Sequence, residues 1–225
     1  MKSVIIVAAG SGTRFGSDIP KQFHILGGKP LIAHTISRFE ECRSIDEIVI
    51  VCSSGQIDAT ENIVKDHKFT KVKHVVAGGK TRAESVKNGF AAVNKNALIV
   101  AVHDGVRPFV TPTEIDAVLE KADETGSACL VGLVVDTIKE IDGEKIARTI
   151  DRNSLRRALT PQAFRYSILR EALSGDLGED VTDECSLVER LGLPIAFIEG
   201  SSRNIKITTP DDILIAESFL ADRAR

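Results

Sequence analysis

The sequence predicts an α/β fold built on a mostly parallel sheet. Short apolar runs rich in Val and Ile alternate with segments of helical period from the N-terminus to about residue 125, which is typical of βα units. Gly-containing loops follow several of these runs. In a parallel sheet such loops lie at the carboxyl edge, where ligands bind. The length of 225 residues suits one large domain, so we expect a single domain over residues 1–225.

The strands are expected at the apolar runs, whose composition predicts that both of their faces are covered, as in central strands. They are Ser3–Ala8, Glu47–Val51, Lys73–Val76, Ala97–His103 and Cys129–Val134. Apolar residues at 3.6-residue spacing predict helices that pack one face on the sheet. These stripes are Ile32, Ile36 and Phe39; Val86, Phe90 and Val93; and Ile115, Val118, Leu119 and Ala122. Together the elements predict a Rossmann-like sheet with helices on both faces.

Several helix ends can also be predicted. Thr81-x-x-Glu84 and Thr111-x-x-Glu114 are capping boxes, in which a hydroxyl and a carboxylate satisfy backbone donors reciprocally. The segment Thr209–Asp212 is similar, and its proline suits a first helical turn. Gly126 and Gly192 are expected just beyond helix ends.

Segment 136–151 interrupts the alternation and is predicted to form a protruding β-hairpin arm. Two strand-like pieces flank Asp142-Gly143, a strong signal for a two-residue turn. Neither piece has a clean apolar face, and an isolated hairpin is marginally stable in water. The economical hypothesis is a homodimer whose subunits exchange arms.

Composition and charge exclude several classes of protein. With 29 basic and 32 acidic residues the net charge is −3. The sequence thus lacks the excess of basic residues that is typical of a nucleic-acid-binding protein, and we expect no nucleic-acid partner. The longest apolar stretches are about six residues, far below the roughly 18 that span a bilayer, so we expect no membrane partner. The four cysteines form no C-x-x-C pair, and the N-terminus does not read as a signal peptide. We therefore expect a reduced, cytoplasmic protein.

The first candidate binding loop is Ala8–Gly16, which follows the first strand. Its glycines allow backbone N–H groups to approach oxygens and form an anion-binding concavity. The spacing G-x-G-x-x-x-G differs from that of dinucleotide folds, and no Walker A sequence is present. For the loop alone, a tight turn without a ligand is the alternative. Arg14 and Lys21 favour a polyphosphate instead, because they bring two cations to one concavity.

The fourth expected strand ends in a candidate metal site. Asp104 and Arg107 follow His103 there, at the same edge of the sheet as the first loop. Mg²⁺ prefers one or two carboxylates together with substrate phosphates and water, so Asp104 is the candidate ligand. The alternative for Asp104 alone is a turn cap, and His103 is predicted to be a packed strand residue rather than a ligand.

A third loop, Gly78–Ser85, has backbone donors that could read a base edge. Four later segments mix a cation or hydroxyl with an expected turn: Thr149–Asn153, Leu159–Gln162, Asp180–Glu184 and Asn204–Thr208. Within them, Arg152, Thr182, Lys206 and Thr208 suit a second, phosphorylated substrate. For each residue alone, a solvated surface position is the alternative.

These motifs resemble those of nucleotidyltransferases that activate sugars and alditols, in which A-A-G-x-G-T-R is followed by P-K. Here Ala8–Arg14 and Pro20-Lys21 carry that pattern. Within this group the chain is similar to the methylerythritol phosphate cytidylyltransferase family over nearly all its length. The other matching motifs lie at 78–86, 103–108, 151–153, 160–162, 182–184 and 204–206. The resemblance implies cytidylyl transfer from CTP to 2-C-methyl-D-erythritol 4-phosphate, a small alditol phosphate, with Mg²⁺ as cofactor and a homodimer.

The resemblance also implies roles for individual residues. The nucleotide-binding residues are expected to be Ala8, Ala9, Gly10, Gly79, Ser85 and Arg107, with Asp104 as the metal ligand. The substrate-binding residues are expected to be Thr137, Arg152, Thr182, Lys206 and Thr208, the first two reaching across from a partner's arm. The catalytic residues are expected to be Arg14, Lys21, Arg152 and Lys206.

The expected reaction is in-line attack of the alditol phosphate on the α-phosphorus of CTP. A phosphate monoester is already anionic and needs no general base, so cations that position two repelling anions would provide most of the catalysis. Three other functions stay open on the residues alone. They are transfer to ribitol 5-phosphate, a nicotinamide-dependent oxidoreductase and a non-catalytic nucleotide sensor.

Overall fold

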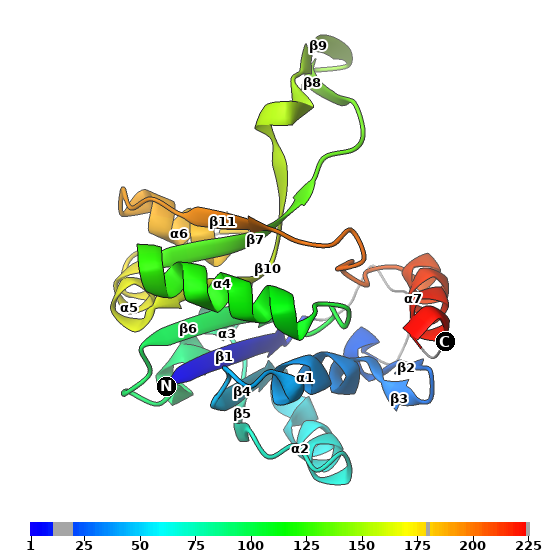
Figure 1. Cartoon of the computed structure of the whole chain (residues 1–225), viewed down its shortest axis with the longest axis vertical. Coiled ribbons are helices and arrows are strands. Elements are labelled where there is room, and N and C mark those ends of the chain that lie inside the picture. The colour runs from blue at the N-terminus through cyan, green and yellow to red at the C-terminus, as the bar shows by residue number, and fades with distance from the viewer. Residues whose placement is uncertain (11–19, 179–180, 224–225) are drawn as a thin grey trace.

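The computed structural model describes residues 1–10, 20–178 and 181–223. The described residues form a seven-stranded sheet in the order β11-β7-β10-β6-β1-β4-β5 (Figure 1). The strands are β1 (Lys2–Ala8), β4 (Glu47–Cys52), β5 (Val72–Ala77), β6 (Ile99–Asp104), β7 (Ser127–Leu133), β10 (Arg156–Arg165) and β11 (Ala196–Glu199). Strand β10 runs antiparallel to both of its neighbours, and every other pair is parallel. The predicted mostly parallel α/β sheet is therefore confirmed.

Helices cover both faces of this sheet. They are α1 (Leu31–Glu41), α2 (Ile57–Asp66), α3 (Arg82–Ala92), α4 (Pro112–Thr125), α5 (Tyr166–Ser174) and α6 (Glu184–Arg190). Helix α7 (Pro210–Arg223) packs in a separate cluster. Alternate residues of β1 belong to two buried clusters: Val4 and Ile6 pack with α1 and α4, whereas Ile5 packs with α3, α5 and α6. The three predicted apolar stripes all lie in these clusters, so their assignment to the sheet-facing side is correct.

Short elements connect the main ones. They are the single turns η2 (Lys21–Phe23), η3 (Ser54–Gln56) and η4 (Arg152–Ser154), and the two-residue strands β2 (Ile25–Leu26) and β3 (Lys29–Pro30). A third apolar cluster joins Leu26 and Leu31 to Phe109, Ile207 and Ala216, and so seats α7 beside the carboxyl edge of the sheet.

Two expectations about strands are wrong. Leu159–Gln162 was expected at a turn, but it lies inside β10, where a cis Thr160-Pro161 bond accompanies a shift in register. The backbone is irregular at this point without leaving the sheet. Strand β5 was expected to be covered on both faces, but it is an edge strand with Lys73 and His74 exposed.

The helix caps agree with the sequence only in part. Thr111 and Glu114 form the reciprocal box, and Gly126 follows α4 with a φ of 96°. Thr81 also caps α3 by accepting a hydrogen bond from the Glu84 amide. The Glu84 carboxylate, however, accepts from the Lys80 amide at 2.7 Å rather than from Thr81, so that box is only half formed.

The predicted arm is present and projects from the body of the molecule (Figure 1). It consists of β8 (Ile138–Asp142) and β9 (Lys145–Ile150), which pair with each other as a separate two-stranded sheet. The turn is Gly143-Glu144, one residue later than expected, and Gly143 has a φ of 58°. Among the described helices, none is long and apolar enough to cross a membrane.

Candidate active site

A pocket of about 420 Å³ opens at the carboxyl edge of the sheet, where β1 and β6 end side by side. This edge is where parallel α/β sheets bind ligands, because the loops that leave the strands converge there. The pocket is lined by Val7, Ala8, Ala9, Gly10, Lys21, Gln22, Gly79, Lys80, Thr81, Arg82, Ser85, Asp104, Val106, Lys206 and Thr208. Loops that are far apart in the sequence thus form one polar concavity.

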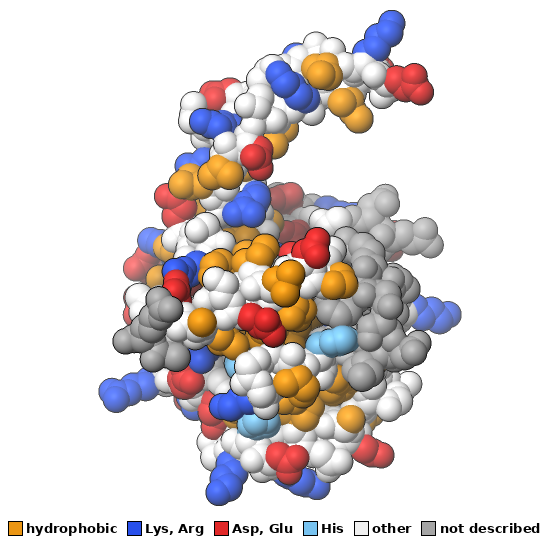
Figure 2. Space-filling view, turned by 90° about the vertical axis from the view of Figure 1, so that its right-hand side faces the viewer, with side chains coloured by type: hydrophobic (Ala, Val, Ile, Leu, Met, Phe, Trp, Pro, Cys, Tyr) orange, Lys and Arg blue, Asp and Glu red, His pale blue; other side chains and the backbone are white. Residues whose placement is uncertain are grey.

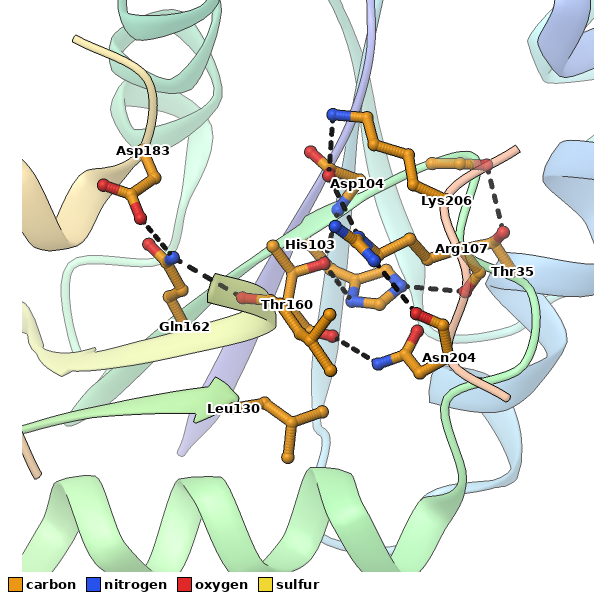
Figure 3. Close-up of polar contacts among 12 residues, drawn as sticks. Thr35, His103, Asp104, Arg107, Leu130, Thr160, Gln162, Asp183, Asn204 and Lys206 are labelled. Carbon is orange, nitrogen blue, oxygen red and sulfur yellow. Dashed lines mark hydrogen bonds and ion pairs between the residues drawn. The ribbon is translucent and has the colours of Figure 1, made fainter. Parts of the chain in front are cut away.

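Asp104 is the electrostatic centre of this pocket (Figure 3). Its Oδ2 lies 3.0 Å from Lys206 Nζ and 3.2 Å from Arg107 Nε. Its Oδ1 lies 3.4 Å from a terminal nitrogen of Arg82, which the figure does not label. Burial would raise the pKa of this carboxyl, but Arg82, Lys206 and Arg107 outweigh it and hold the pKa well below its ordinary value. Asp104 is therefore an anion at neutral pH and holds three cations together.

A second set of contacts fixes Arg107 and the backbone of Asp104 (Figure 3). Arg107 donates to the Asn204 carbonyl at 2.9 Å, and the Asn204 amide group donates to the Thr160 carbonyl at 2.9 Å. The Asp104 N–H donates to the Thr160 hydroxyl oxygen at 3.2 Å. The buried β10 irregularity thus positions the residues at the end of β6, and Arg107 lies behind Asp104 rather than in the pocket lining.

His103 is a packed strand residue, as expected. Its Nε2 lies 3.1 Å from the Arg107 carbonyl, which can only accept, and its Nδ1 lies 3.0 Å from the Thr160 hydroxyl. The neutral ring therefore carries its proton on Nε2 and accepts at Nδ1. Burial lowers the pKa of His103 to about 4, so the ring is neutral at pH 7.

The third predicted loop forms one wall of the pocket. Ser85 is buried, accepts a hydrogen bond from the Gly79 N–H at 3.1 Å and donates to the Thr81 carbonyl at 2.9 Å. A Cβ on Gly79 would lie 2.4 Å from the Cβ of Glu84, and one on Gly78 would lie 2.5 Å from that of Ala9. Glycine is required here because the loop packs against both α3 and the end of β1.

The start of the first loop, at Ala8, is anchored through Gln22. This buried side chain donates from Nε2 to the Ala8 carbonyl at 2.9 Å and lies 2.9 Å from Gln56 Oε1. Its neighbour Lys21 begins η2 and lines the pocket. Arg14, which was predicted to act beside Lys21, lies outside the described residues.

Arg82 was not assigned a role from the sequence, although it lies in a recognised loop. Its guanidinium contacts Glu184 at 2.5 Å on one side and Asp104 on the other. Glu184 begins α6 and is fully buried. The pairing joins residues 102 positions apart, and no local pattern in the sequence could have indicated it.

A second hollow of about 340 Å³ adjoins the first, and Lys206 and Thr208 line both. Arg107 and Arg157 also line it, and their mutual repulsion contributes to lowering the pKa of Arg107, for which burial is the largest cause. The Thr208 hydroxyl donates to Asp212 at 2.9 Å, so toward a ligand it can only accept. Arg157 was missed because nothing in the sequence distinguishes it from Arg156.

The remaining predicted residues do not gather at the pocket. Thr137 and Arg152 are exposed at the base of the arm, where Arg152 donates to the Val135 carbonyl. Thr182 is also exposed and lines neither hollow. The pocket lining therefore includes Ala8, Ala9, Gly10, Lys21, Gly79, Ser85, Asp104, Lys206 and Thr208 among the predicted site residues.

The donor set at Asp104 fits Mg²⁺ in the presence of a phosphorylated ligand. Among the described residues, no three metal-ligating side chains come together, so the protein offers no complete cage. One carboxylate on a pocket wall matches the way Mg²⁺ is held by one or two carboxylates, phosphates and water. The Oδ1 atom of Asp104 has the longer contact, 3.4 Å to Arg82, and is the oxygen with room for a further ligand.

Comparisons with known proteins point to one family. The family model of 2-C-methyl-D-erythritol 4-phosphate cytidylyltransferase matches residues 2–222. The enzyme of that name from Syntrophus aciditrophicus is 43% identical over 220 residues, 96% of this chain and 94% of its own. That from Halalkalibacterium halodurans is 41% identical over 225 residues, 99% of this chain and 98% of its own. The crystal structure of 4-diphosphocytidyl-2C-methyl-D-erythritol synthase from Anaerococcus prevotii superposes with a TM-score of 0.87 at 28% identity, covering 98% and 96% of the two chains.

Proposed function

The chain belongs to the 2-C-methyl-D-erythritol 4-phosphate cytidylyltransferase family, and on that premise we propose how its residues divide the work. The protein is a nucleotidyltransferase that moves a cytidylyl group from CTP to 2-C-methyl-D-erythritol 4-phosphate in isoprenoid synthesis. Membership favours this reaction over the ribitol phosphate, nicotinamide and sensor alternatives.

We assign CTP to the first pocket. Its wall of small residues, from Ala8 to Gly10 and at Gly79, suits the cytidine because it lets backbone polar groups approach the ring and the sugar closely. Ser85 acts by holding the Gly79 amide in place. Lys21 supplies positive charge for the triphosphate, together with the predicted contribution of Arg14.

We assign the alditol phosphate to the second hollow. Arg107, Arg157 and Lys206 give it positive charge, whereas Thr208 and Asp212 offer acceptors for the substrate's hydroxyl groups. Lys206 lines both hollows and lies 3.0 Å from Asp104, and this single observation carries the assignment. One ammonium group can then approach both anions at their meeting point.

The chemistry needs no proton transfer from the protein. An oxygen of the monoester phosphate attacks the α-phosphorus of CTP, a new P–O bond forms, and the bond to pyrophosphate breaks. Lys21 and Lys206 offset the charge on the α-phosphate and on the leaving oxygens. Arg107 and Arg157 hold the attacking phosphate in line, which converts an encounter of two anions into a positioned reaction.

We propose Mg²⁺ as the cofactor, held by Asp104 with the triphosphate. The ion would neutralise triphosphate charge and orient the α-phosphate. The fit of one pocket carboxylate to this ion supports the proposal. In the protein without ligands, Lys206, Arg107 and Arg82 balance the charge of Asp104 instead.

We further propose that the protein is a homodimer whose arms reach the partner's site. Exposed apolar side chains on and below the arm support this, and Figure 2 shows such side chains along it. Ile141 and Ile146 are 70% and 65% exposed, which is costly on an isolated hairpin. Thr137 and Arg152 line neither hollow of their own chain and could reach a partner's second hollow.

A reduced, cytoplasmic location is also a proposal. It is supported by the cysteines, all four of which are buried as free thiols. Such thiols persist where the surroundings are reducing.

The test is pyrophosphate release from CTP, Mg²⁺ and the alditol phosphate. Lys21→Ala should lower kcat by about 100-fold or more, because removal of one preorganised donor costs that much. Lys71→Ala, whose ammonium donates to the Cys42 carbonyl outside the pocket, is the matched control and should retain activity. Ribitol 5-phosphate should replace the alditol phosphate poorly. Near-normal turnover of Lys21→Ala would contradict the assignment of the first pocket.

A further inference from the structure

We propose that Arg82 is an additional cation for the triphosphate of CTP and that the buried Glu184 is the positioning residue that aims it. The inference rests on the assignment of the first pocket to CTP. It concerns a pair of residues on α3 and α6 that the reaction scheme above leaves without a role.

Glu184 is an acidic side chain that is fully buried, which is unusual. It begins α6 and is fully buried, next to Cys185, which belongs to the apolar cluster under α3, α5 and α6. Its Oε1 contacts Arg82 at 2.5 Å, and among the described residues its Oε2 has no hydrogen-bond partner. Burying a carboxylate in this way is costly, so a purely structural role would be served as well by an uncharged side chain.

The position of α6 makes this contact specific. The Glu184 N–H and the next amide, that of Cys185, both donate to Gln162 Oε1 at 3.1 Å. The Gln162 amide group in turn donates to Asp183 at 2.8 Å (Figure 3). Strand β10 thereby fixes the first turn of α6, from which the Glu184 side chain reaches Arg82.

The geometry leaves one side of Arg82 directed at the reaction centre. One terminal nitrogen is engaged by Glu184, and the other lies 3.4 Å from Asp104 Oδ1. That second contact is long for a charge-assisted hydrogen bond, so it can be exchanged for a phosphate oxygen at little cost. Arg82 lines the pocket with 23% of its side chain exposed, which gives a ligand access to it.

Charge balance supports the same role. Around Asp104 and Glu184 lie Arg82, Arg107 and Lys206, so this cluster carries one net positive charge before Lys21 is counted. A triphosphate and a phosphate monoester bring several negative charges, more than one net positive charge can neutralise. Glu184 holds the guanidinium through one terminal nitrogen and leaves the other nitrogen available to a phosphate oxygen.

The experiment compares Arg82→Gln, Glu184→Gln and the double variant in pyrophosphate release. We expect Arg82→Gln to lower kcat/KM for CTP by about 100-fold and Glu184→Gln by about tenfold, with KM for the alditol phosphate changed less than twofold. The double variant should be no worse than Arg82→Gln, because Glu184 acts through Arg82. Arg38→Gln removes an arginine of similar exposure, 22%, that pairs with Glu41 outside the pocket, and it should retain full activity.

Three outcomes would overturn the inference. The first is a kcat/KM for CTP of Arg82→Gln within twofold of the wild type. The second is a rise in KM for the alditol phosphate as large as the loss in kcat/KM for CTP, and the third is a double variant whose loss in kcat/KM is the product of the two single losses. If Glu184→Gln fails to fold, Arg82→Lys keeps the charge and loses the two-sided contact, and it should still lose at least fivefold in kcat/KM for CTP. A smaller loss would count against the inference. Failure of the wild-type enzyme to release pyrophosphate would instead contradict the proposed function itself.

Discussion

Lys206 and Asp104 form an ion pair at the boundary between the two hollows, with Nζ 3.0 Å from Oδ2. Arg107 Nε lies 3.2 Å from the same oxygen, so one carboxylate atom contacts two cations. Arg107 is tied to the Asn204 carbonyl, whereas the Lys206 side chain is more than one-third exposed. Lys206 is thus the cation that can leave Asp104 and follow substrate.

Subunit complementation tests whether the arm acts in the partner's site. Lys206→Ala and Arg152→Ala should each be nearly inactive alone. When the two are unfolded and refolded together, half of the dimers are mixed and one of their two sites is intact, so about a quarter of wild-type activity should return. If Arg152 acted within its own chain, mixing would restore nothing.

Asp104→Asn should destabilise the protein at neutral pH. The substitution leaves Arg82, Arg107 and Lys206 facing one another without their shared carboxylate, at a cost of about 3 kcal/mol. Because the folded-state pKa of Asp104 is lowered, its contribution is complete above the ordinary value of 3.8 and is lost as the pH falls below it. Denaturant unfolding should give a much lower unfolding free energy for Asp104→Asn than for the wild type at pH 7, and a smaller difference at pH 3. A difference that is the same at both pH values would contradict the cation cluster.

Burial of His103 predicts a second pH effect, at higher pH than that of Asp104. Its pKa is about 4 in the folded state against 6.5 when unfolded, so the unfolded chain binds the proton first. The contribution of His103 to the unfolding free energy is therefore complete above pH 6.5, and about 3 kcal/mol of it is lost as the pH drops toward 4. In His103→Asn, the slope of the unfolding free energy between these pH values should be shallower. An unchanged slope would mean that the ring is not held neutral by burial.

Ser85→Ala tests the wall of the nucleotide pocket. It removes the acceptor of the Gly79 N–H and the donor to the Thr81 carbonyl, each worth about 1 kcal/mol. We expect kcat/KM for CTP to fall about tenfold, with KM for the alditol phosphate unchanged. Ser37→Ala is the matched control, because Ser37 also donates to a backbone carbonyl but lies on α1 outside the pocket. Equal effects of the two substitutions would argue against a role for the loop in binding CTP.

Much of the fold could be predicted because it follows from local patterns. The stripe Ile32, Ile36 and Phe39 and the cap of Thr111 with Glu114 are short-range features, and both are present. Strand β10 was missed because Thr160-Pro161 reads as a turn. Its place in the sheet comes from neighbours β6 and β7, which are distant in the sequence.

The candidate site could also be predicted only in part. Loops at strand ends placed Lys21 and Asp104 at one edge, because parallel strands align their carboxyl ends. Arg107 was expected beside the nucleotide but lies behind Asp104, since Asn204 draws it toward the second hollow. Contacts such as Arg82 with Glu184 depend on the packing of α3 and α6 near β10, which no local motif encodes.

The most direct test is a crystal structure of the protein with CTP and Mg²⁺. We predict the triphosphate in the first pocket, with the α-phosphate within hydrogen-bond reach of Lys21, the ion on Asp104, and Lys206 turned away from that carboxylate. A nucleotide bound outside this pocket, or a triphosphate that leaves the Asp104 and Lys206 pair untouched, would contradict the account.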